Sequence, residues 1–453
     1  MSLHVVILAA GQGKRMHSTL PKVLHPLAGR PLLAHVVDAA RRLAPRRIHV
    51  VYGHGGTQVV AAFDGEDIDW VEQTEQLGTG HALMQALPGL DHKGKVLVLN
   101  GDVPLVGEKT LAALAEAGRG GLAILSCDLI DPTGYGRVLR DSQDRVLRIV
   151  EHKDATPDEL AIREWYTGAL CGSVARIAAW LARVTNQNTQ REYYLTDVIG
   201  QAASDGLEVI CVKAGDAWEV AGVNSKRELA DLEREMQRRV AQRLLEEGVT
   251  LADPARLDVR GELVCARDVS IDVNCVFEGR VTLGERVRIG PNCVLRNVSV
   301  AADCEVHAFS LLEDALVGER CRIGPYARLR PGARLAEEVH IGNFVEIKAS
   351  RIGAGSKANH LSYVGDAEIG SKVNIGAGTI TCNYDGSAKH RTVIEDECFV
   401  GSDATLVAPV RIARGSYIGA GSTISKDTPA GQLTVARARQ ISVPSWKPPK
   451  KTG

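Results

Sequence analysis

Aromatic side chains are scarce in this 453-residue sequence, where Phe, Trp and Tyr together make up 4% of the residues. The 10 cysteines include no C-x-x-C pair, so neither a zinc cluster nor a redox-active dithiol is expected. The formal net charge is −1, which implies no general affinity for nucleic acid or for an anionic membrane surface. No apolar run reaches the length that a membrane-spanning helix needs. We therefore expect neither nucleic acid nor a membrane among the partners.

An export signal is also missing from the beginning of the sequence. The apolar run that ends at Ala10 is short and no basic segment precedes it, whereas a secretory signal peptide has a basic region and a longer apolar core. The cysteines are scattered along the chain rather than paired. Because unpaired thiols are typical of a reducing compartment, we expect a cytoplasmic protein.

The C-terminal part of the sequence repeats with a period of six residues. An aliphatic residue followed by a small or acidic one, as in Ile341-Gly342, recurs between Ile271 and Ile424 with slips of single residues and one interruption at 381–392. Such a period predicts a parallel β-helix, in which three short strands close one triangular coil and stacking of the coils buries the aliphatic side chains. An ordinary β-sandwich with scattered Ile-Gly pairs is the alternative, and a repeat kept over this length argues against it.

The first half of the sequence alternates between apolar, strand-like runs and helical patterns. Strands are expected at 5–10, 47–52 and 96–99, with helices at 32–43 and 81–87. This alternation predicts a doubly wound α/β sheet. The ligand site of such a sheet lies beyond the carboxyl ends of its strands.

Two segments directly follow strand ends and are candidates for that site. Gly11-Gln12-Gly13 follows the first strand, and Asp102 follows the third. Glycines after a strand let backbone amides approach a phosphate, and Arg15 and Lys22 add positive charge. The loop is neither a Walker loop nor a dinucleotide fingerprint, because no G-K-[ST] closes it and Met16 replaces the third glycine. A plain strand–turn–helix is the alternative interpretation of the glycine loop, and a helix cap or turn residue is the alternative for Asp102.

An amphipathic helix is expected between the two halves. Ser225 and Glu228 have the spacing of a capping box, apolar residues follow at helical spacing from Leu229 to Leu244, and Gly248 supplies a stop. The helix has the pattern of a rigid spacer, and its apolar stripe is too short to favour a coiled coil. The predicted organisation is a head at 1–226, a linker helix at 227–247 and a β-helix at 248–453.

Several segments together resemble one family of enzymes. Leu8-Ala9-Ala10-Gly11-x-Gly13-x-Arg15-Met16 with Pro21-Lys22 is similar to the signature of sugar-phosphate nucleotidyltransferases, and 76–80, Gly101-Asp102 and 151–153 extend the match. With the hexapeptide region behind it, the chain resembles the bacterial bifunctional N-acetylglucosamine-1-phosphate uridyltransferases / glucosamine-1-phosphate acetyltransferases. The resemblance implies a Rossmann-like α/β head and a left-handed parallel β-helix tail. It also implies UTP and acetyl-CoA as co-substrates, Mg²⁺ as cofactor, and a homotrimer with sites between subunits.

On the family's pattern, the head would carry the site for uridylyl transfer. Asp102 and Asn224 would hold Mg²⁺, a cation that prefers oxygen ligands, and Arg15 and Lys22 would stabilise the departing pyrophosphate. The residues that would bind the substrates are Leu8, Ala9, Ala10, Gly11, Lys22, Gln73, Gly78, Thr79, Asn100, Gly101, Asp102, Gly136, Glu151, Tyr166 and Asn224.

One position in the head departs from this pattern. The family usually has Asn before Thr-Gly, whereas this chain has Tyr166 before Thr167-Gly168. Gly136 and Glu151 would contact the sugar in the same pocket. The departure puts one polar contact to the sugar in doubt.

The tail would carry the acetyl-transfer site. His360 would be the general base that takes a proton from the glucosamine amine as the amine attacks the thioester, and Glu346 would orient its imidazole. The residues that would bind the sugar phosphate are Arg330, Lys348, Tyr363, Asn374, Asn383 and Tyr384, the last two in the interruption of the repeat. The residues that would line the coenzyme A groove are Ala377, Ser402, Ala420 and Arg437.

Two other functions fit parts of the sequence. A sugar-1-phosphate nucleotidyltransferase with one activity could use the hexapeptide tail only for oligomerisation or regulation. A regulatory or scaffold protein could carry both folds without chemistry. The residue sets around Asp102 and His360 distinguish these alternatives, since a scaffold needs neither set.

Overall fold

The computed structural model describes residues 2–53 and 55–449. Contacts within the chain divide it into two compact units, Met1–Met236 and Gln237–Gly453. No helix in the described ranges is long and apolar enough to cross a membrane.

The division falls inside helix α8 (Lys226–Glu246). Its capping box is confirmed, because the Ser225 hydroxyl accepts from the Glu228 amide at 3.2 Å and the Glu228 carboxylate accepts from the Ser225 amide at 2.9 Å. Leu232 belongs to an apolar cluster of the first unit, and Leu244 belongs to the core of the second. The boundaries 1–226, 227–247 and 248–453 stay a prediction, since a helix shared in this way can be assigned to either unit.

The first unit is built on a sheet of nine strands. Seven of them follow the order β11-β7-β10-β6-β1-β4-β5, and β8 and β9 are attached through β10. The strands are β1 (Leu3–Leu8), β4 (Arg47–Tyr52), β5 (Asp69–Glu72), β6 (Lys95–Asn100), β7 (Leu122–Asp128), β8 (Arg137–Arg140), β9 (Val146–Val150), β10 (Glu164–Ser173) and β11 (Val209–Lys213). The expected strands at 5–10, 47–52 and 96–99 are therefore present, as β1, β4 and β6.

The sheet is mixed rather than wholly parallel. Strand β10 pairs antiparallel with both β6 and β7, while β1 is parallel to β4 and β6. The register of β10 against β7 shifts between Tyr166 and Leu170. This irregularity lies at the position where the sequence departs from the family's pattern.

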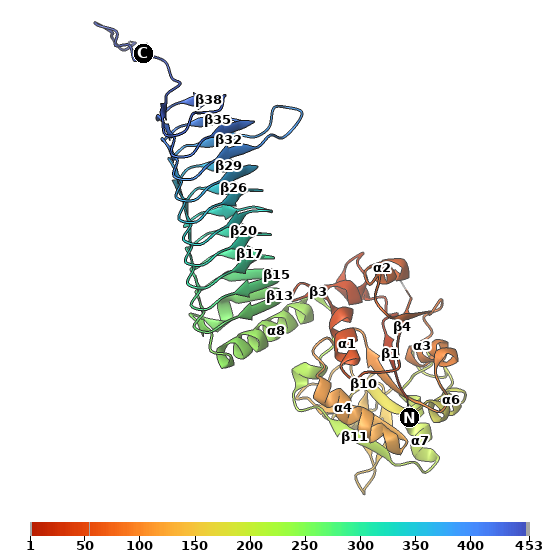
Figure 1. Cartoon of the computed structure of the whole chain (residues 1–453). Coiled ribbons are helices and arrows are strands. Elements are labelled where there is room, and N and C mark those ends of the chain that lie inside the picture. Colours follow the sequence, from red (N-terminus) through yellow and green to blue (C-terminus); the bar gives the residue numbers. More distant parts are fainter. Residues whose placement is uncertain (1, 54, 450–453) are drawn as a thin grey trace. The chain divides into compact units, whose positions relative to one another are not determined.

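Helices cover both faces of this sheet (Figure 1). Val5 and Ile7 of β1 join the apolar cluster that includes Leu33 and Leu111, whereas Val6 joins the opposite cluster with Leu83. Burial on both faces explains why the strands are continuous apolar runs. The helices are α1 (Leu32–Arg41), α2 (Gly56–Ala61), α3 (Thr79–Ala86), α4 (Glu108–Ala117), α5 (Pro157–Leu160), α6 (Val174–Leu181) and α7 (Asp197–Ser204).

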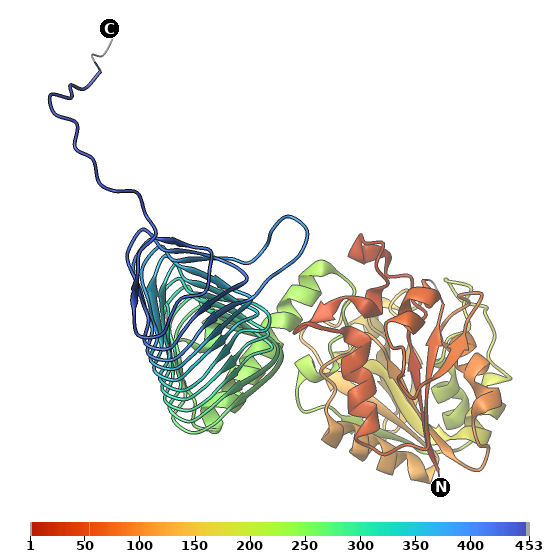
Figure 2. The same cartoon turned by 45° about the horizontal axis from the view of Figure 1, so that its top comes forward.

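The second unit is a parallel β-helix, as the period of six predicts. Its coils are stacked along one axis in Figure 1, and their triangular outline is visible in the oblique view of Figure 2. One face is a sheet of 11 strands, and the other two faces alternate within a sheet of 17 strands. Parallel pairing joins Ile271 to Ile289 and Ile323 to Ile341 on successive coils.

The short strands of the β-helix follow the chain in order around the coils. The sheet of 11 comprises β12 (Thr250–Leu251), β14 (Ser270–Ile271), β16 (Arg288–Ile289), β19 (Glu305–Val306), β22 (Arg322–Ile323), β25 (His340–Asn343), β28 (Lys357–His360), β31 (Asn374–Ile375), β34 (Phe399–Val400), β37 (Tyr417–Ile418) and β39 (Leu433–Thr434). The sheet of 17 comprises β13 (Leu257–Cys265), β15 (Cys275–Leu283), β17 (Val294–Arg296), β18 (Ser299–Val300), β20 (Leu311–Glu313), β21 (Leu316–Val317), β23 (Arg328–Leu329), β24 (Arg334–Leu335), β26 (Glu346–Lys348), β27 (Arg351–Ile352), β29 (Tyr363–Gly365), β30 (Ala367–Ile369), β32 (Ile380–Cys382), β33 (Thr392–Ile394), β35 (Thr405–Val407), β36 (Val410–Ile412) and β38 (Thr423–Ile424).

The repeating aliphatic residues form the core of the β-helix. Those at the start, middle and end of the pattern, such as Ile271, Ile347 and Ile418, are all at most 3% exposed. The interruption of the repeat is a loop that leaves the coil between β32 and β33 and projects from it in Figure 2. A stacked core with one expelled loop is the architecture that the sequence predicts.

The three corners of the β-helix differ in chemistry. Corner residues adopt the left-handed backbone conformation, with φ near +55° at Arg320 and Tyr326. One corner is charged and carries Arg286, Asp303, Arg320, Glu338, Lys372 and Glu397, and another carries Asn297, Asp314, Ala349 and Asp366. The third, which we call the apolar ladder, carries Phe309, Tyr326, Phe344 and Leu361 on successive coils.

Candidate active sites

A cavity of about 560 Å³ opens at the carboxyl ends of β1 and β6. It collects the predicted nucleotide residues from the loop after β1, from the start of α3 and from the end of β6. Predicted residues that line it are Leu8, Ala9, Ala10, Gly11, Lys22, Gln73, Gly78, Thr79, Asn100 and Asp102. The prediction did not include Gln12, Lys14, Val23, Gln76, Ala82 and Glu192, which also line it.

Two glycines shape this cavity because a side chain would not fit. Gly13 has φ +60°, and a Cβ there would lie 2.8 Å from Cβ of Lys22. Gly78, which precedes α3, has φ +107°, and a Cβ would lie 2.7 Å from the Tyr193 carbonyl oxygen. Glycine tolerates the positive φ and has no Cβ to clash. The loop after β1 and the start of α3 can therefore pack closely against Lys22 and Tyr193.

A second cavity of about 270 Å³ adjoins the first. The two share Leu8, Thr79, Asn100 and Asp102 in their linings. The predicted residues that line the second cavity are Leu8, Arg15, Thr79, Asn100, Asp102, Gly136, Glu151, Tyr166 and Asn224. Lining residues that the prediction did not assign to the site include Tyr135, Trp165, Thr196 and Gly222.

Of the binding residues predicted for the head, Gly101 lines neither cavity. Its amide donates to the Leu8 carbonyl oxygen at 2.9 Å, which ties the end of β6 to β1. A Cβ at this glycine would lie 3.3 Å from Cβ of Ala9. Gly101 therefore acts through close backbone packing next to the site.

Three polar side chains meet where the two cavities adjoin. The Lys22 ammonium donates to Oδ2 of Asp102 and, at 3.2 Å, to Oδ1 of Asn224. The side chains of Lys22 and Asp102 are 14% and 17% exposed. A carboxylate and an amide oxygen that converge on one cation are the donor types that Mg²⁺ prefers, so the residues present fit that metal. Within the described residues, no cluster of three or more His, Cys, Asp or Glu forms another candidate metal site.

The second cavity contains the half-buried carboxylate of Glu151. The Thr196 hydroxyl donates to Oε1 of Glu151 at 3.0 Å. Burial raises the pKa of Glu151, and the charges of Asp154 and Asp197 raise it further, although the bond from Thr196 opposes them. Tyr166 is 6% exposed, and burial together with the nearby Glu151 charge raises the pKa of its hydroxyl.

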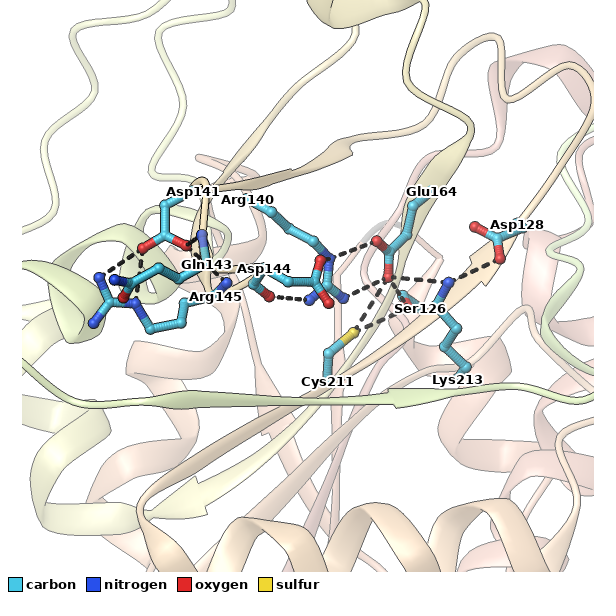
Figure 3. Close-up of polar contacts among 10 residues, drawn as sticks. All are labelled: Ser126, Asp128, Arg140, Asp141, Gln143, Asp144, Arg145, Glu164, Cys211 and Lys213. Atoms are coloured by element: carbon cyan, nitrogen blue, oxygen red, sulfur yellow. Dashed lines mark hydrogen bonds and ion pairs between the residues drawn. The ribbon is translucent and has the colours of Figure 1, made fainter.

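An ionic network anchors the strand that carries Tyr166 (Figure 3). Arg140 donates from Nε and Nη2 to the two oxygens of Glu164 at 2.8 and 2.9 Å, and the Ser126 hydroxyl donates to Glu164 at 2.7 Å. Burial opposes ionisation, but the bonds from Arg140 and Ser126 lower the pKa of Glu164 to about 2. Because Glu164 begins β10, this network fixes the strand two residues before Tyr166.

The predicted catalytic histidine of the tail contacts an asparagine. Nδ1 of His360 lies 2.8 Å from Oδ1 of Asn343, and the two residues pair in parallel between β28 and β25. The expectation that Glu346 orients the imidazole is not what the structure shows, because the Glu346 carboxylate accepts from Arg330 at 2.9 Å. Glu346 lies on β26 of the other sheet, so the corner of the coil separates it from the histidine.

Three of the predicted sugar-phosphate residues gather around Asp366. Lys348 donates to Oδ2 of Asp366 at 3.2 Å, and the Asn383 amide donates to the same oxygen. The Asn383 amide also lies 3.4 Å from the Tyr363 hydroxyl. Asp366 was not singled out from the sequence, where it directly follows the Val364-Gly365 pair of the ordinary repeat.

The other predicted residues of the tail lie apart from this group. Asn374 is on β31, in the same sheet as His360. Tyr384 is 61% exposed in the expelled loop, where its hydroxyl donates to the Gly386 carbonyl oxygen at 2.7 Å. Within one chain, His360 and the Lys348 group thus flank one corner of the coil rather than share one enclosed pocket.

The predicted coenzyme A residues form one column above His360. The register pairs Ala358 with Ile375, Ile375 with Val400 and Val400 with Ile418. Each of these four paired residues is followed, two positions later, by one member of the column: His360, Ala377, Ser402 and Ala420. Arg437 closes the column, and its Nη1 donates to the Ala420 carbonyl oxygen at 2.6 Å.

Models of known protein families match separate parts of the chain. Residues 5–154 match the model of the MobA-like NTP transferase domain, 259–358 match the GMPPB C-terminal domain, and 391–426 match the bacterial transferase hexapeptide with six repeats. A solved UDP-glucose pyrophosphorylase complexed with UDP-glucose aligns with 53% of this chain and 100% of its own, at 15% identity and a TM-score of 0.45. That likeness is too low to bear on function.

Curated relatives match over almost the whole chain. The bifunctional protein GlmU of Chromobacterium violaceum is 61% identical over 450 residues, which are 99% of either chain. GlmU of Azoarcus sp. is 61% identical over 99% of this chain and 100% of its own. GlmU of Bordetella bronchiseptica is 59% identical over 454 residues, again 99% of either chain.

Proposed function

Because this chain belongs to the family of the bifunctional protein GlmU, we propose that it makes UDP-N-acetylglucosamine in two steps. The tail transfers the acetyl group of acetyl-CoA to glucosamine 1-phosphate. The head then transfers a uridylyl group from UTP to N-acetylglucosamine 1-phosphate and releases pyrophosphate. The observation that carries the proposal is that the residues assigned to the head's reaction line two adjoining cavities at Asp102, while residues assigned to the tail's reaction flank the corner of the coil beside His360.

In the head, the larger cavity would bind UTP and the smaller one the sugar phosphate. Asn100 and Asp102 lie in the linings of both cavities, so the α-phosphorus and the attacking sugar phosphate would meet there. Little covalent chemistry is needed from the protein in such a transfer, because catalysis depends on in-line positioning and on neutralisation of charge. Arg15 and Lys22 supply the positive charge at this point.

Asp102 and Asn224 would hold Mg²⁺. The metal would neutralise the charge that develops on the phosphates. Lys22, which contacts both oxygens, keeps the carboxylate and the amide turned toward one another. The two side chains thus form a preorganised pair of oxygen ligands between the nucleotide and the sugar.

In the tail, His360 would act as the general base. The amide oxygen of Asn343 can only accept, so it selects the tautomer in which Nδ1 carries the proton. Nε2 then holds the free lone pair that can take a proton from the amine as it attacks the thioester. Arg330 and Lys348 would bind the phosphate of glucosamine 1-phosphate. The column of Ala377, Ser402 and Ala420 leaves room for coenzyme A beside the histidine, with Arg437 and Asn374 at its borders.

The apolar ladder supports a homotrimer with sites between subunits. Its side chains are 47–63% exposed, and the rings of Phe309, Tyr326 and Phe344 stack with centroids 4.9 and 5.3 Å apart. The ladder is an apolar stretch of four successive coils on its corner, while a neighbouring corner is charged. An exposed apolar strip of this length marks a protein interface. Leu361 directly follows His360, so a second copy docked here would cover the base and would bring its own expelled loop with Asn383 and Tyr384 to the site.

Assays of both half-reactions on the purified chain test the proposal. Wild-type protein should acetylate glucosamine 1-phosphate with acetyl-CoA and should form UDP-N-acetylglucosamine from UTP. A chain that performs only the second reaction would favour the nucleotidyltransferase with a single activity. A chain that performs neither reaction would favour the scaffold.

A further inference from the structure

Asp366 lies at the corner of the coil between β29 and β30, and its carboxylate joins two distant segments of the tail. Oδ2 accepts from the Lys348 ammonium on the preceding coil at 3.2 Å and from the side-chain amide of Asn383. The side chains of Lys348 and Asp366 are 17% and 22% exposed. Burial opposes ionisation of Lys348, but the bond to Asp366 is the largest of the effects that raise the pKa of its ammonium. The carboxylate thus holds Lys348 charged and in one place.

Asp366 also binds both ends of the expelled loop. Where the loop leaves β32, the carboxylate accepts from Asn383. Where the loop returns to β33, the Thr392 amide donates to the Asp366 carbonyl oxygen at 3.3 Å. Between these ends the two strands of the loop are joined, because the His390 amide donates to the Asn383 carbonyl oxygen at 2.8 Å. A loop bound at both ends has a fixed direction, and that direction decides where the exposed Tyr384 lies.

We propose that Asp366 is a positioning residue of acetyl transfer, which acts on the sugar phosphate through Lys348 and through the base of the expelled loop. This inference rests on the proposed function of the tail. A lysine carries its charge on a flexible stem, and fixing such a side chain during binding costs affinity. Asp366 fixes the ammonium before the substrate arrives. Because an ammonium has three donors, others remain for the phosphate while one is bonded to Asp366.

The backbone of this corner does not require a carboxylate. Asp366 has φ +49°, and Asp314 and Ala349 on the same corner have φ +43° and +44°, so alanine adopts this conformation too. Asp314 has contacts of the same kind as Asp366. Its Oδ1 accepts from the Asn297 side chain at 3.0 Å, and its carbonyl oxygen accepts from the Gly332 amide at 3.1 Å. These contacts lie outside the proposed acetyl-transfer site, which makes Asp314→Ala the matched control.

The test compares Asp366→Ala, Lys348→Ala, the double variant and Asp314→Ala with the wild type in the full chain. Acetyl transfer is assayed for kcat, for KM of glucosamine 1-phosphate and for KM of acetyl-CoA. Uridylyl transfer by the same preparations reports on the head, and thermal melting reports on the folding of the tail. Asp366→Asn keeps the shape of the side chain, and it carries the test if Asp366→Ala melts early.

Asp366→Ala should raise KM for glucosamine 1-phosphate about tenfold, the effect of losing a hydrogen bond between charged groups, while KM for acetyl-CoA and uridylyl transfer stay the same. Asp366→Asn should show a smaller rise, because its amide oxygen still accepts from one of the two donors. The loss caused by Asp366→Ala should shrink in the Lys348→Ala background, since residues in contact do not act additively. An unchanged KM for glucosamine 1-phosphate, an equal loss in both backgrounds, or the same rise in Asp314→Ala overturns the inference. Wild-type protein without acetyl transfer overturns the proposed function of the tail instead.

Discussion

Nδ1 of His360 is hydrogen bonded to the side-chain oxygen of Asn343 on the preceding coil, at 2.8 Å. The pairing of β25 with β28 places the two residues side by side. This contact presets the tautomer in which Nε2 is free to accept a proton. The resemblance alone assigned that orienting role to Glu346, which pairs with Arg330.

Replacing Asn343 should therefore change acetyl transfer without touching the base itself. In Asn343→Ala the ring loses its fixed orientation, and kcat should fall about two- to tenfold, the value of one hydrogen bond. In Asn343→Asp the added negative charge favours imidazolium, so the acidic limb of the pH profile of kcat/KM should move to higher pH. His360→Ala provides the reference, and its rate of acetyl transfer should fall about 10²–10⁴-fold. Profiles of both Asn343 variants that coincide with the wild type at every pH would remove this residue from the mechanism.

Asp102→Ala should abolish uridylyl transfer and leave acetyl transfer intact. The substitution removes a carboxylate that would hold Mg²⁺ and leaves Lys22 with Asn224 as its remaining bonded oxygen. Both half-reactions are measured over a Mg²⁺ titration. If the variant keeps most of its uridylyl activity at saturating Mg²⁺, the metal assignment is wrong.

Phe344→Glu should weaken the trimer and acetyl transfer together. Phe344 is 56% exposed and stacks on Tyr326, so a charge there opposes docking of an apolar surface while it leaves the buried core untouched. The matched control is Lys372→Glu, an exposed position of the same backbone conformation on the charged corner. Light scattering at micromolar concentration gives the mass of each variant. A Phe344→Glu protein that stays trimeric would show that the apolar ladder lies outside the interface.

The stability of the first unit should fall as the pH drops below about 6.5. His4 and His49 are both 3% exposed, and their rings lie side by side at the edge where β1 and β4 begin. Burial lowers the pKa of His4, and the Arg46 charge lowers it further, although Asp91 and Asp69 oppose the shift. Burial also lowers the pKa of His49, again opposed by Asp69 and reinforced by His4 and Arg47.

Because both pKa values are lowered, the folded unit loses stability as the pH falls. In the unfolded chain the histidines are protonated near their ordinary pKa of about 6.5. In the folded unit His4 and His49 are protonated only at lower pH. The stability contribution is thus complete above pH 6.5 and is lost as the pH falls toward the folded pKa. Tryptophan fluorescence follows melting at pH 7.5 and 5.5. His49→Gln should reduce the difference between the two melting temperatures, while the exposed His92→Gln should not; equal differences in all three proteins would contradict the assignment.

Periodic and local features of this protein follow from the sequence alone. The period of six determines the β-helix, because every coil repeats the same local geometry and each aliphatic residue has one way to face inward. The capping box at Ser225 and the strands β1, β4 and β6 are likewise local patterns. The loop between β32 and β33 follows too, since a stretch that breaks the repeat cannot remain in the coil.

Only the tertiary structure decides which residues from distant segments meet. The antiparallel insertion of β10 between β6 and β7 depends on long-range pairing that no local pattern encodes. The expected contact between Glu346 and His360 is absent for the same reason. The register between adjacent coils places His360 beside Asn343 and Glu346 beside Arg330. Tyr166 shows this most clearly: the sequence marks it as unusual, but only the fold shows that its hydroxyl is buried and has no hydrogen-bond partner within residues 2–53 and 55–449.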